Sequence, residues 1–240
     1  MKQVFVTAAA AGFGFAIAGA SFVAAPAWAQ SAKFAASWDT DPVSVAAHAS
    51  CAADPEGDCL VVDGPNVGAE VEMAQIHVAT HKSVLIGVSS QIGIHLVTVA
   101  KGKGGESGDF SSSALAQGDV KATVTLVNQD SSGEDCVVAP GPIILKAESR
   151  RLTVSATATE GDIEVEVGIG TNSVSANHFN FLGVECDQGW YDAMVHFDLS
   201  ALALASGFDS SADVWVTLGP QMVTLQEVRA VKGSLVEDTD

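Results

Sequence analysis

Residues 69–103 read AEVEMAQIHVATHKSVLIGVSSQIGIHLVTVAKGK, and they form the densest structural signal in the chain. The segment is apolar, turns once near residues 79–82 and then stays apolar to Ala100. Between Ser83 and Ala100 there is no Asp, Glu, Lys or Arg. The pattern predicts a long β-hairpin at the centre of a sheet, with both faces of its second arm covered.

The first arm of this segment changes phase. Val71 and Met73 alternate with glutamates, and then Ala74, Ile76 and Val78 become the apolar set. Because side chains alternate with period two along a strand, a change of phase by one residue predicts a β-bulge at Met73–Ala74.

Further short strands are predicted after this segment. Residues 121–128, KATVTLVN, alternate clearly, and so do residues 162–170, DIEVEVGIG, whose Ile163, Val165, Val167 and Ile169 should face a core while Glu164 and Glu166 face water. Residues 214–218 and 222–231 read as two strands joined by a turn at Gly219-Pro220. Ser200–Ser206, SALALAS, is the one candidate for a short helix. The predicted fold class is therefore all-β, an antiparallel β-sandwich of about ten strands with at most one short helix.

The first 29 residues read as a cleavable signal peptide. Lys2 precedes an apolar run from Val4 to Ala25, and Ala27-Trp28-Ala29 matches a small-x-small cleavage site before Gln30. A retained membrane anchor is the alternative, but the run is rich in Ala and Gly. We expect a secreted or periplasmic protein with no transmembrane segment in its mature chain.

The rest of the chain divides into three expected parts. Residues 30–59 are rich in Ala and Ser and read as an extended arm that ends in a disulfide loop. Residues 60–236 hold the strands of the sandwich. Residues 237–240 form an acidic tail.

The chain is strongly acidic. Its formal net charge is −18, which becomes −19 when residues 1–29 and their single Lys are removed. Such a surface repels phosphate, so nucleic acid and anionic membranes are disfavoured as partners.

The four cysteines should form disulfides, because an even number of cysteines in an exported chain favours disulfides over free thiols. Three pairings are possible, and we favour Cys51–Cys59 and Cys136–Cys186. A zinc site is disfavoured because no two cysteines have CxxC-type spacing.

Several groups of polar residues are candidates for metal or acid–base chemistry. Asp54, Glu56 and Asp58 lie in the expected Cys51–Cys59 loop and could bind calcium, although the calcium-loop spacing is absent. Asp130, Glu134 and Asp135 form a similar group. His77 and His81 lie on or beside an expected strand, where four residues span about 13 Å, which is too far to share one ion, and His95 is not expected near either of them. His178 and His196, with Asp187, Asp192 and Asp198, form one further polar cluster. No metal site and no cofactor are predicted.

Trp190, Tyr191 and Trp215 are candidates for a stacking surface for carbohydrate. No catalytic motif is present, and residues 87–91, GVSSQ, lack the second Gly of G-x-S-x-G. We therefore expect a protein that is not an enzyme.

Three functional hypotheses follow. The first is an exported β-sandwich that acts by binding or assembly, as a cell-surface, matrix or filament component that self-associates or binds other surface proteins. The second is a module that binds a small ligand or carbohydrate with calcium as support. The third is a hydrolase whose site is assembled from distant residues. Assembly by β-augmentation would require an open edge strand.

Overall fold

The computed structural model describes residues 33–52, 59–80, 82–104, 110–130, 133–156 and 163–229, and the regular structure of these residues is β-strand throughout. Eleven strands follow one another along the chain: β1 (Phe34–Asp39), β2 (Val43–Cys51), β3 (Leu60–Asp63), β4 (Asn66–Val78), β5 (Lys82–Gly104), β6 (Ser111–Asn128), β7 (Val137–Ala139), β8 (Ile143–Ser155), β9 (Ile163–Val184), β10 (Gly189–Gly207) and β11 (Ser210–Arg229). The predicted all-β antiparallel sandwich is confirmed.

The strands form two antiparallel sheets. The six-stranded sheet has the order β1-β11-β5-β9-β7, with β2 also paired to β11, and the five-stranded sheet has the order β3-β10-β6-β8, with β4 also paired to β10. If β1–β2 and β3–β4 each count as one interrupted strand and the three-residue β7 is left out, eight main strands remain. The first pairs with the eighth, the second with the seventh, the third with the sixth and the fourth with the fifth. Successive main strands alternate between the sheets, except that β6 and β8 are neighbours in the five-stranded sheet. This nested pairing is the topology of a jelly roll.

The predicted hairpin in residues 69–103 is wrong. Its arms, β4 and β5, lie in different sheets: β4 pairs with β10, whereas β5 lies between β11 and β9. The turn near Thr80 therefore crosses from one sheet to the other instead of reversing within a sheet. Period-two alternation shows which face of a strand is buried, but it does not distinguish these two kinds of turn.

The second arm, β5, is central in its sheet but is covered on one face. Its inward residues, including Ile86 and Ile94, are fully buried. Its outward residues, including Leu85, Val97 and Val99, are half-buried between the side chains of neighbouring strands. The expectation of two covered faces is therefore wrong. Between Ser83 and Ala100 the outward positions of β5 carry no charged side chain, so this part of the outer face is uncharged, whereas Lys101 and Lys103 lie beyond it.

Two irregularities that interrupt the alternation in sequence are both bulges. The pairing of β4 with β10 shifts where Met73–Ala74 lie opposite Ala193, which confirms the predicted bulge. The pairing of β11 with β5 shifts between Leu218 and Gln221. The predicted turn at Gly219-Pro220 is thus a bulge inside one continuous strand.

The predicted short helix at Ser200–Ser206 is also wrong, because these residues lie within β10. SALALAS alternates with period two, and its Ala201, Ala203 and Ala205 are buried. Alanine favours helices in isolation, but burial of one face against the opposite sheet overrides that preference.

The core combines large side chains from both sheets with a run of small side chains from the five-stranded sheet. β5 and β11 contribute Val, Ile and Leu, whereas β6 and β10 contribute many alanines. Gly118 on β6 shows how tight this fit is, since a Cβ there would lie 2.6 Å from Val216 Cγ2 and 3.2 Å from Ile94 Cγ2. Small residues let the sheets approach closely enough to exclude water.

The segment interpreted as an extended arm contributes two strands to the sandwich. β1 and β2 pair with consecutive parts of β11, so the six-stranded sheet begins at Phe34 rather than after residue 59. The expected signal peptide at residues 1–29 and the acidic tail at residues 237–240 lie outside the described residues.

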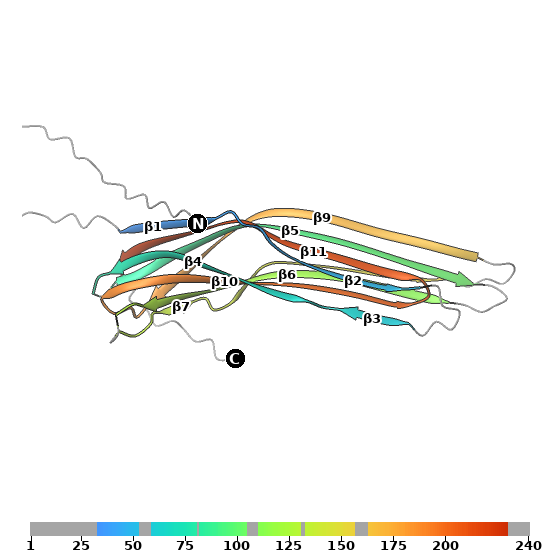
Figure 1. Ribbon diagram of the computed structural model, residues 1–240, viewed down its shortest axis with the longest axis horizontal. Helices are drawn as coiled ribbons and strands as arrows, with labels where there is room; N and C mark the ends of the chain where they lie inside the picture. The colour runs from blue at the N-terminus through green and yellow to red at the C-terminus, as the bar shows by residue number, and fades with distance from the viewer. Residues whose placement is uncertain are drawn as a thin grey trace, which may run out of the picture.

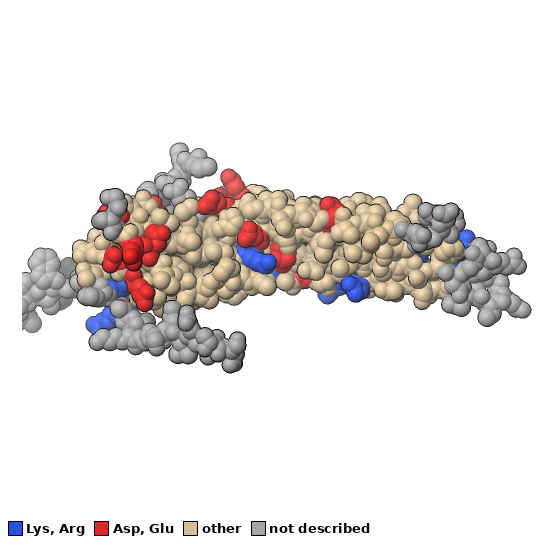
Figure 2. Space-filling model, turned by 90° about the horizontal axis from the view of Figure 1, so that it is seen from below, with Lys and Arg blue, Asp and Glu red and all other residues tan. Residues whose placement is uncertain are grey.

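Long strands give the molecule the shape of a rod (Figure 1). β5 has 23 residues, which corresponds to about 75 Å at the usual rise of a strand. Seen from the side of the five-stranded sheet, acidic side chains gather toward one end and the centre of the rod (Figure 2).

The disulfides lie at opposite ends of this rod. They join Cys51 to Cys59 and Cys136 to Cys186, with Cα–Cα distances of 5.8 Å and 4.6 Å, and these are the pairs that the sequence predicts. The first links the end of β2 to the start of β3. The second links the β6–β7 connection to the β9–β10 connection.

Candidate functional site

The candidate site is a sheet edge. A sandwich of two sheets has four edges, and each exposes unpaired backbone N–H and C=O groups. Here the edges are β1 with β2, β3 with β4, β8, and β9, which β7 covers at one end. Proteins normally obstruct such edges with breaks, bulges or charges.

Two of the edges are interrupted. The β1–β2 edge breaks at residues 40–42, where Pro42 has no N–H to offer. The β3–β4 edge breaks at Gly64-Pro65, is bulged at Met73–Ala74 and exposes the charge of Glu70. Neither edge presents a long regular row of backbone groups.

The β8 edge is obstructed by charge. Lys146 and Glu148 lie opposite the inward residues Val120 and Gly118 of β6, so both point into the gap between the sheets. The Lys146 ammonium is 3.6 Å from Glu148 and donates hydrogen bonds to the carbonyls of Ser173 (3.1 Å) and Ile92 (3.4 Å). Inward-pointing charges are one of the features that keep an edge strand from pairing with a further strand.

The β9 edge has no break, no bulge and no inward-pointing charge among its described residues. Its register with β5 is unbroken from Val84–Gly183 to Gly104–Ile163, and β7 pairs with Leu182–Val184 only. Among the described residues, the outer side of Ile163–Phe181 therefore has no partner strand. We call these 19 residues the open edge of β9. Their sequence contains no Lys, Arg, Asp or Pro.

The open edge also exposes apolar side chains. Val165, Val167 and Ile169 lie opposite Gly102, Ala100 and Thr98, on the side of the sheet that faces the core. Ala100 is fully buried, yet Val165, Val167 and Ile169 are 38%, 37% and 39% exposed, and the outward Val174 is 62% exposed. The prediction that one face of DIEVEVGIG is buried is thus wrong, because β9 overhangs the five-stranded sheet.

The two acids of the open edge lie at its beginning. Glu164 and Glu166 face outward, and Glu166 lies 3.5 Å from the Lys101 ammonium on β5. Lys101 also contacts Asp209 at 2.7 Å, and the hydrogen bond from Lys101 to this carboxylate raises the pKa of the lysine. The carboxylate of Glu166 therefore points toward the neighbouring strand β5 of its own sheet.

A Ser–His–Asn chain lies on the outer face of the six-stranded sheet. Ser89 Oγ is 2.7 Å from His178 Nδ1, and His178 Nε2 is 3.2 Å from Asn180 Oδ1. The order resembles a nucleophile, a base and an orienting group. However, β5 is paired with both β11 and β9 at Ser89, so its backbone N–H groups there are not available to stabilise an oxyanion. This geometry fits a cross-strand hydrogen bond rather than a hydrolase site.

The three aromatic candidates for a stacking surface do not lie together. Tyr191 is fully buried, so it cannot stack on a ligand. Trp190 packs on His77 of the five-stranded sheet, with ring centroids 5.2 Å apart, whereas Trp215 packs on His95 of the six-stranded sheet at the same distance. The two tryptophans are about half exposed, on opposite faces of the sandwich. Alternation alone could not show that β10 and β11 belong to different sheets.

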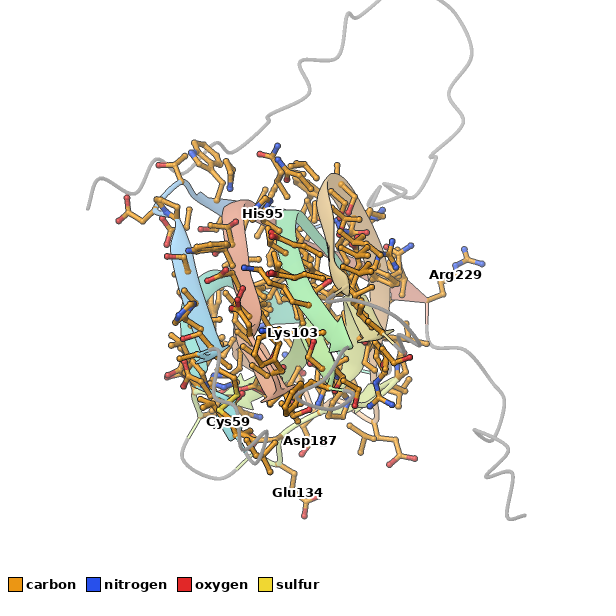
Figure 3. All side chains as sticks on the ribbon, turned by 90° about the vertical axis from the view of Figure 1, so that its right-hand side faces the viewer. Cys59, His95, Lys103, Glu134, Asp187 and Arg229 are labelled. Carbon is orange, nitrogen blue, oxygen red and sulfur yellow. A yellow bond between two sulfur atoms is a disulfide. The ribbon has the colours of Figure 1, made fainter. Side chains whose placement is uncertain are left out.

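The polar clusters are separated in the same way. His178 lies on the outer face of the six-stranded sheet, whereas His196 lies on the outer face of the five-stranded sheet, 2.9 Å from Asp198. Viewed from one end of the rod, His95 lies on the opposite side from Glu134 and Asp187 (Figure 3). The predicted cluster around His178 and His196 is therefore wrong.

The described residues contain no group of three His, Cys, Asp or Glu side chains placed to hold a metal ion. In the acidic group of Asp130, Glu134 and Asp135, Asp135 Oδ1 accepts a hydrogen bond from the Asn128 N–H at 2.7 Å. The calcium candidates Asp54, Glu56 and Asp58, like His81, lie outside the described residues. Among the residues described, no helix is long and apolar enough to span a bilayer.

Sequence reasoning missed the open edge of β9. Its signal was present in sequence as residues 168–184, GIGTNSVSANHFNFLGV, which contain no Asp, Glu, Lys or Arg. The property that makes them a candidate site is the missing neighbour, and that depends on the strand order of the whole sheet.

Comparisons with known proteins assign no family. No family model matches the chain, and no curated protein matches it. Two solved structures, titled "Structure of infectious bursal disease virus Gt strain" and "Structure of infectious bursal disease virus Gx strain", are 10% and 11% identical, with TM-scores of 0.18 and 0.14. The alignments cover 78% and 82% of this chain and 40% of each of those chains. Similarity this low carries no argument about function.

Proposed function

We propose that this is an exported, non-catalytic protein that acts by binding or assembly, and that the open edge of β9 is its binding element. The observation that carries the proposal is the contrast among the four edges. Three are broken, bulged or blocked by inward charges, whereas β9 presents 19 regular residues without a break, a bulge or an inward charge. An edge left in this state invites a further strand.

Export is supported by two observations. The sequence of residues 1–29 has the pattern of a cleavable signal peptide. All four cysteines are paired in disulfides, and such bonds persist in oxidising compartments outside the cytosol. Binding would therefore take place in the periplasm, on the cell surface or in the medium.

Addition of a partner strand would account for the unpaired backbone groups and for the exposed apolar side chains of the open edge. Its unpaired N–H and C=O groups would bond to the backbone of an extended partner segment, which supplies affinity with little dependence on side chains. Val165, Val167 and Ile169 would gain cover from the inward side chains of that segment. The buried apolar area would add to the backbone hydrogen bonds.

The test introduces on β9 an inward-pointing lysine like the one that β8 already carries. Ile169→Lys introduces an inward lysine on the edge, as Lys146 does on β8, and it should leave the melting temperature near that of the parent because Ile169 is 39% exposed. The apparent size of the protein in the exported fraction, measured by size-exclusion chromatography, should fall to that of a monomer. Ile144→Lys is the control on a different edge strand, since Ile144 is 58% exposed and faces outward on β8.

A monomeric parent in the exported fraction would refute the proposal. So would an Ile169→Lys variant that folds and keeps the parent's apparent size. If Ile144→Lys reduced the size as much as Ile169→Lys, assembly would not depend on the open edge of β9.

A further inference from the structure

Resting on the proposed function, we infer that the partner strand at the open edge of β9 is the same strand of a second copy, paired antiparallel about Asn172. The two six-stranded sheets then form one continuous sheet across a two-fold axis. Three features of the edge favour this pairing, namely its distribution of charge, its geometry and its length.

The distribution of charge favours the antiparallel direction. The acids of the open edge, Glu164 and Glu166, both lie near its first residue, and its second half carries no acid. Parallel pairing in register would place each glutamate opposite its own copy, and like charges in opposing positions are destabilising. Antiparallel pairing instead places the glutamates of each copy beside the uncharged end of the other.

The extent of the edge selects the register. Residues that oppose each other in an antiparallel pair point to the same face, and the open edge runs from Ile163 to Phe181. Full overlap therefore places its midpoint, Asn172, on the axis. Glu166 then lies opposite His178 of the second copy, and Val165 lies opposite Phe179 on the inner face.

The charges nearest this axis are already compensated within each copy. Ser173 adjoins Asn172, and the Lys146 and Glu148 groups near it contact each other at 3.6 Å. The Lys146 side chain is 11% exposed and Glu148 is 20% exposed. A second copy would therefore not strand an unpaired charge at the centre of the interface.

The length of the edge is adequate for a specific contact. Nineteen residues from each copy approach the roughly 20–30 residues per side of a standard protein interface. Over about 65 Å of strand, the two copies would form a regular ladder of backbone hydrogen bonds.

A pair of cysteine variants tests the register. Asn172→Cys places two thiols opposite each other across the axis, within the Cα–Cα range of a disulfide. In the same register, Ala176→Cys places its two copies about 27 Å apart, since Ala176 faces Gly168 of the second copy. Asn172 and Ala176 are both exposed and outward-facing on β9, so they form a matched pair.

Each purified full-length variant is oxidised mildly and separated on a non-reducing gel. Asn172→Cys should give at least tenfold more covalent dimer than Ala176→Cys, and the parent should show a dimer on size exclusion that dissociates on dilution. A monomeric parent, or equal cross-linking of the two variants, would overturn the inference.

This outcome is distinct from failure of the proposed function. If the purified protein is monomeric but Ile169→Lys still reduces its size in the exported fraction, a different chain occupies the edge and only the second-copy inference fails. If Ile169→Lys changes neither preparation, both fail.

Discussion

At the scale of single residues, an inward-facing side chain is buried only where the opposite sheet covers it. Val165, Val167 and Ile169 face the core side of their sheet as the sequence indicates, but they stay more than one-third exposed. Tyr191 shows the opposite case, since it was a candidate for a surface platform and is fully buried. Burial depends on the strand in the opposite sheet, and a local pattern contains no information about that strand.

Tyr191 allows a direct test at this scale because it is the single tyrosine of the chain. Burial raises the pKa of its phenol above the ordinary tyrosine value. Below pH about 10 the folded and unfolded states are both protonated, and above it the unfolded state loses its proton first. The free energy of unfolding should therefore decrease as pH rises from about 10 through the folded pKa.

The tyrosinate absorbance near 295 nm, followed by titration of the folded protein, measures this pKa. Tyr191→Phe should remove the part of the alkaline decrease due to this phenol. It should also cost about 1 kcal/mol at neutral pH, because the hydroxyl lies 3.0 Å from Asn128 Nδ2 and 3.2 Å from the Asp187 carbonyl. A midpoint at the ordinary tyrosine value would contradict the prediction.

At the scale of strands and loops, the sequence predicted where most strands lie but not which strands are neighbours. β4 and β5 follow each other closely, yet they lie in different sheets, because the connections between main strands cross from sheet to sheet everywhere except between β6 and β8. β9 and β10 illustrate the consequence, since His178 and His196 are near in sequence but lie on opposite faces. The disulfide pairs were predictable because a short loop and a long one were the simplest way to pair four cysteines.

The two disulfides should differ in their contribution to stability. They join cysteines that are 8 and 50 residues apart, and the loop-entropy model assigns about 2.5 and 4 kcal/mol to loops of these sizes. Replacing Cys136 and Cys186 together by Ser should therefore lower the free energy of unfolding more than replacing Cys51 and Cys59. Urea denaturation of both double variants and the parent measures the difference. Equal losses, or a larger loss for the Cys51 and Cys59 variant, would contradict the model.

At the scale of the whole molecule, long strands combine into a rod with one unobstructed side. The period-two pattern predicted the sandwich but not its elongation, because an in-plane turn and a bulge leave similar signals in sequence. At Gly219-Pro220 the chain continues as one strand of 20 residues instead of forming two short strands. Elongation of this kind makes the open edge of β9 long enough to hold a second copy.

The shape of the assembled protein separates side-by-side pairing from end-to-end pairing. Asn172 pairs with His95, near the middle of β5, so an axis at Asn172 would align two rods along almost their full length. Small-angle X-ray scattering over a concentration series should show a cross-section that roughly doubles in area as dimer forms. The maximum dimension should increase by about 10–15 Å, because the axis lies about two residues from the centre of β5. End-to-end assembly would instead nearly double the length at constant cross-section, and that result would exclude β9 as the shared edge.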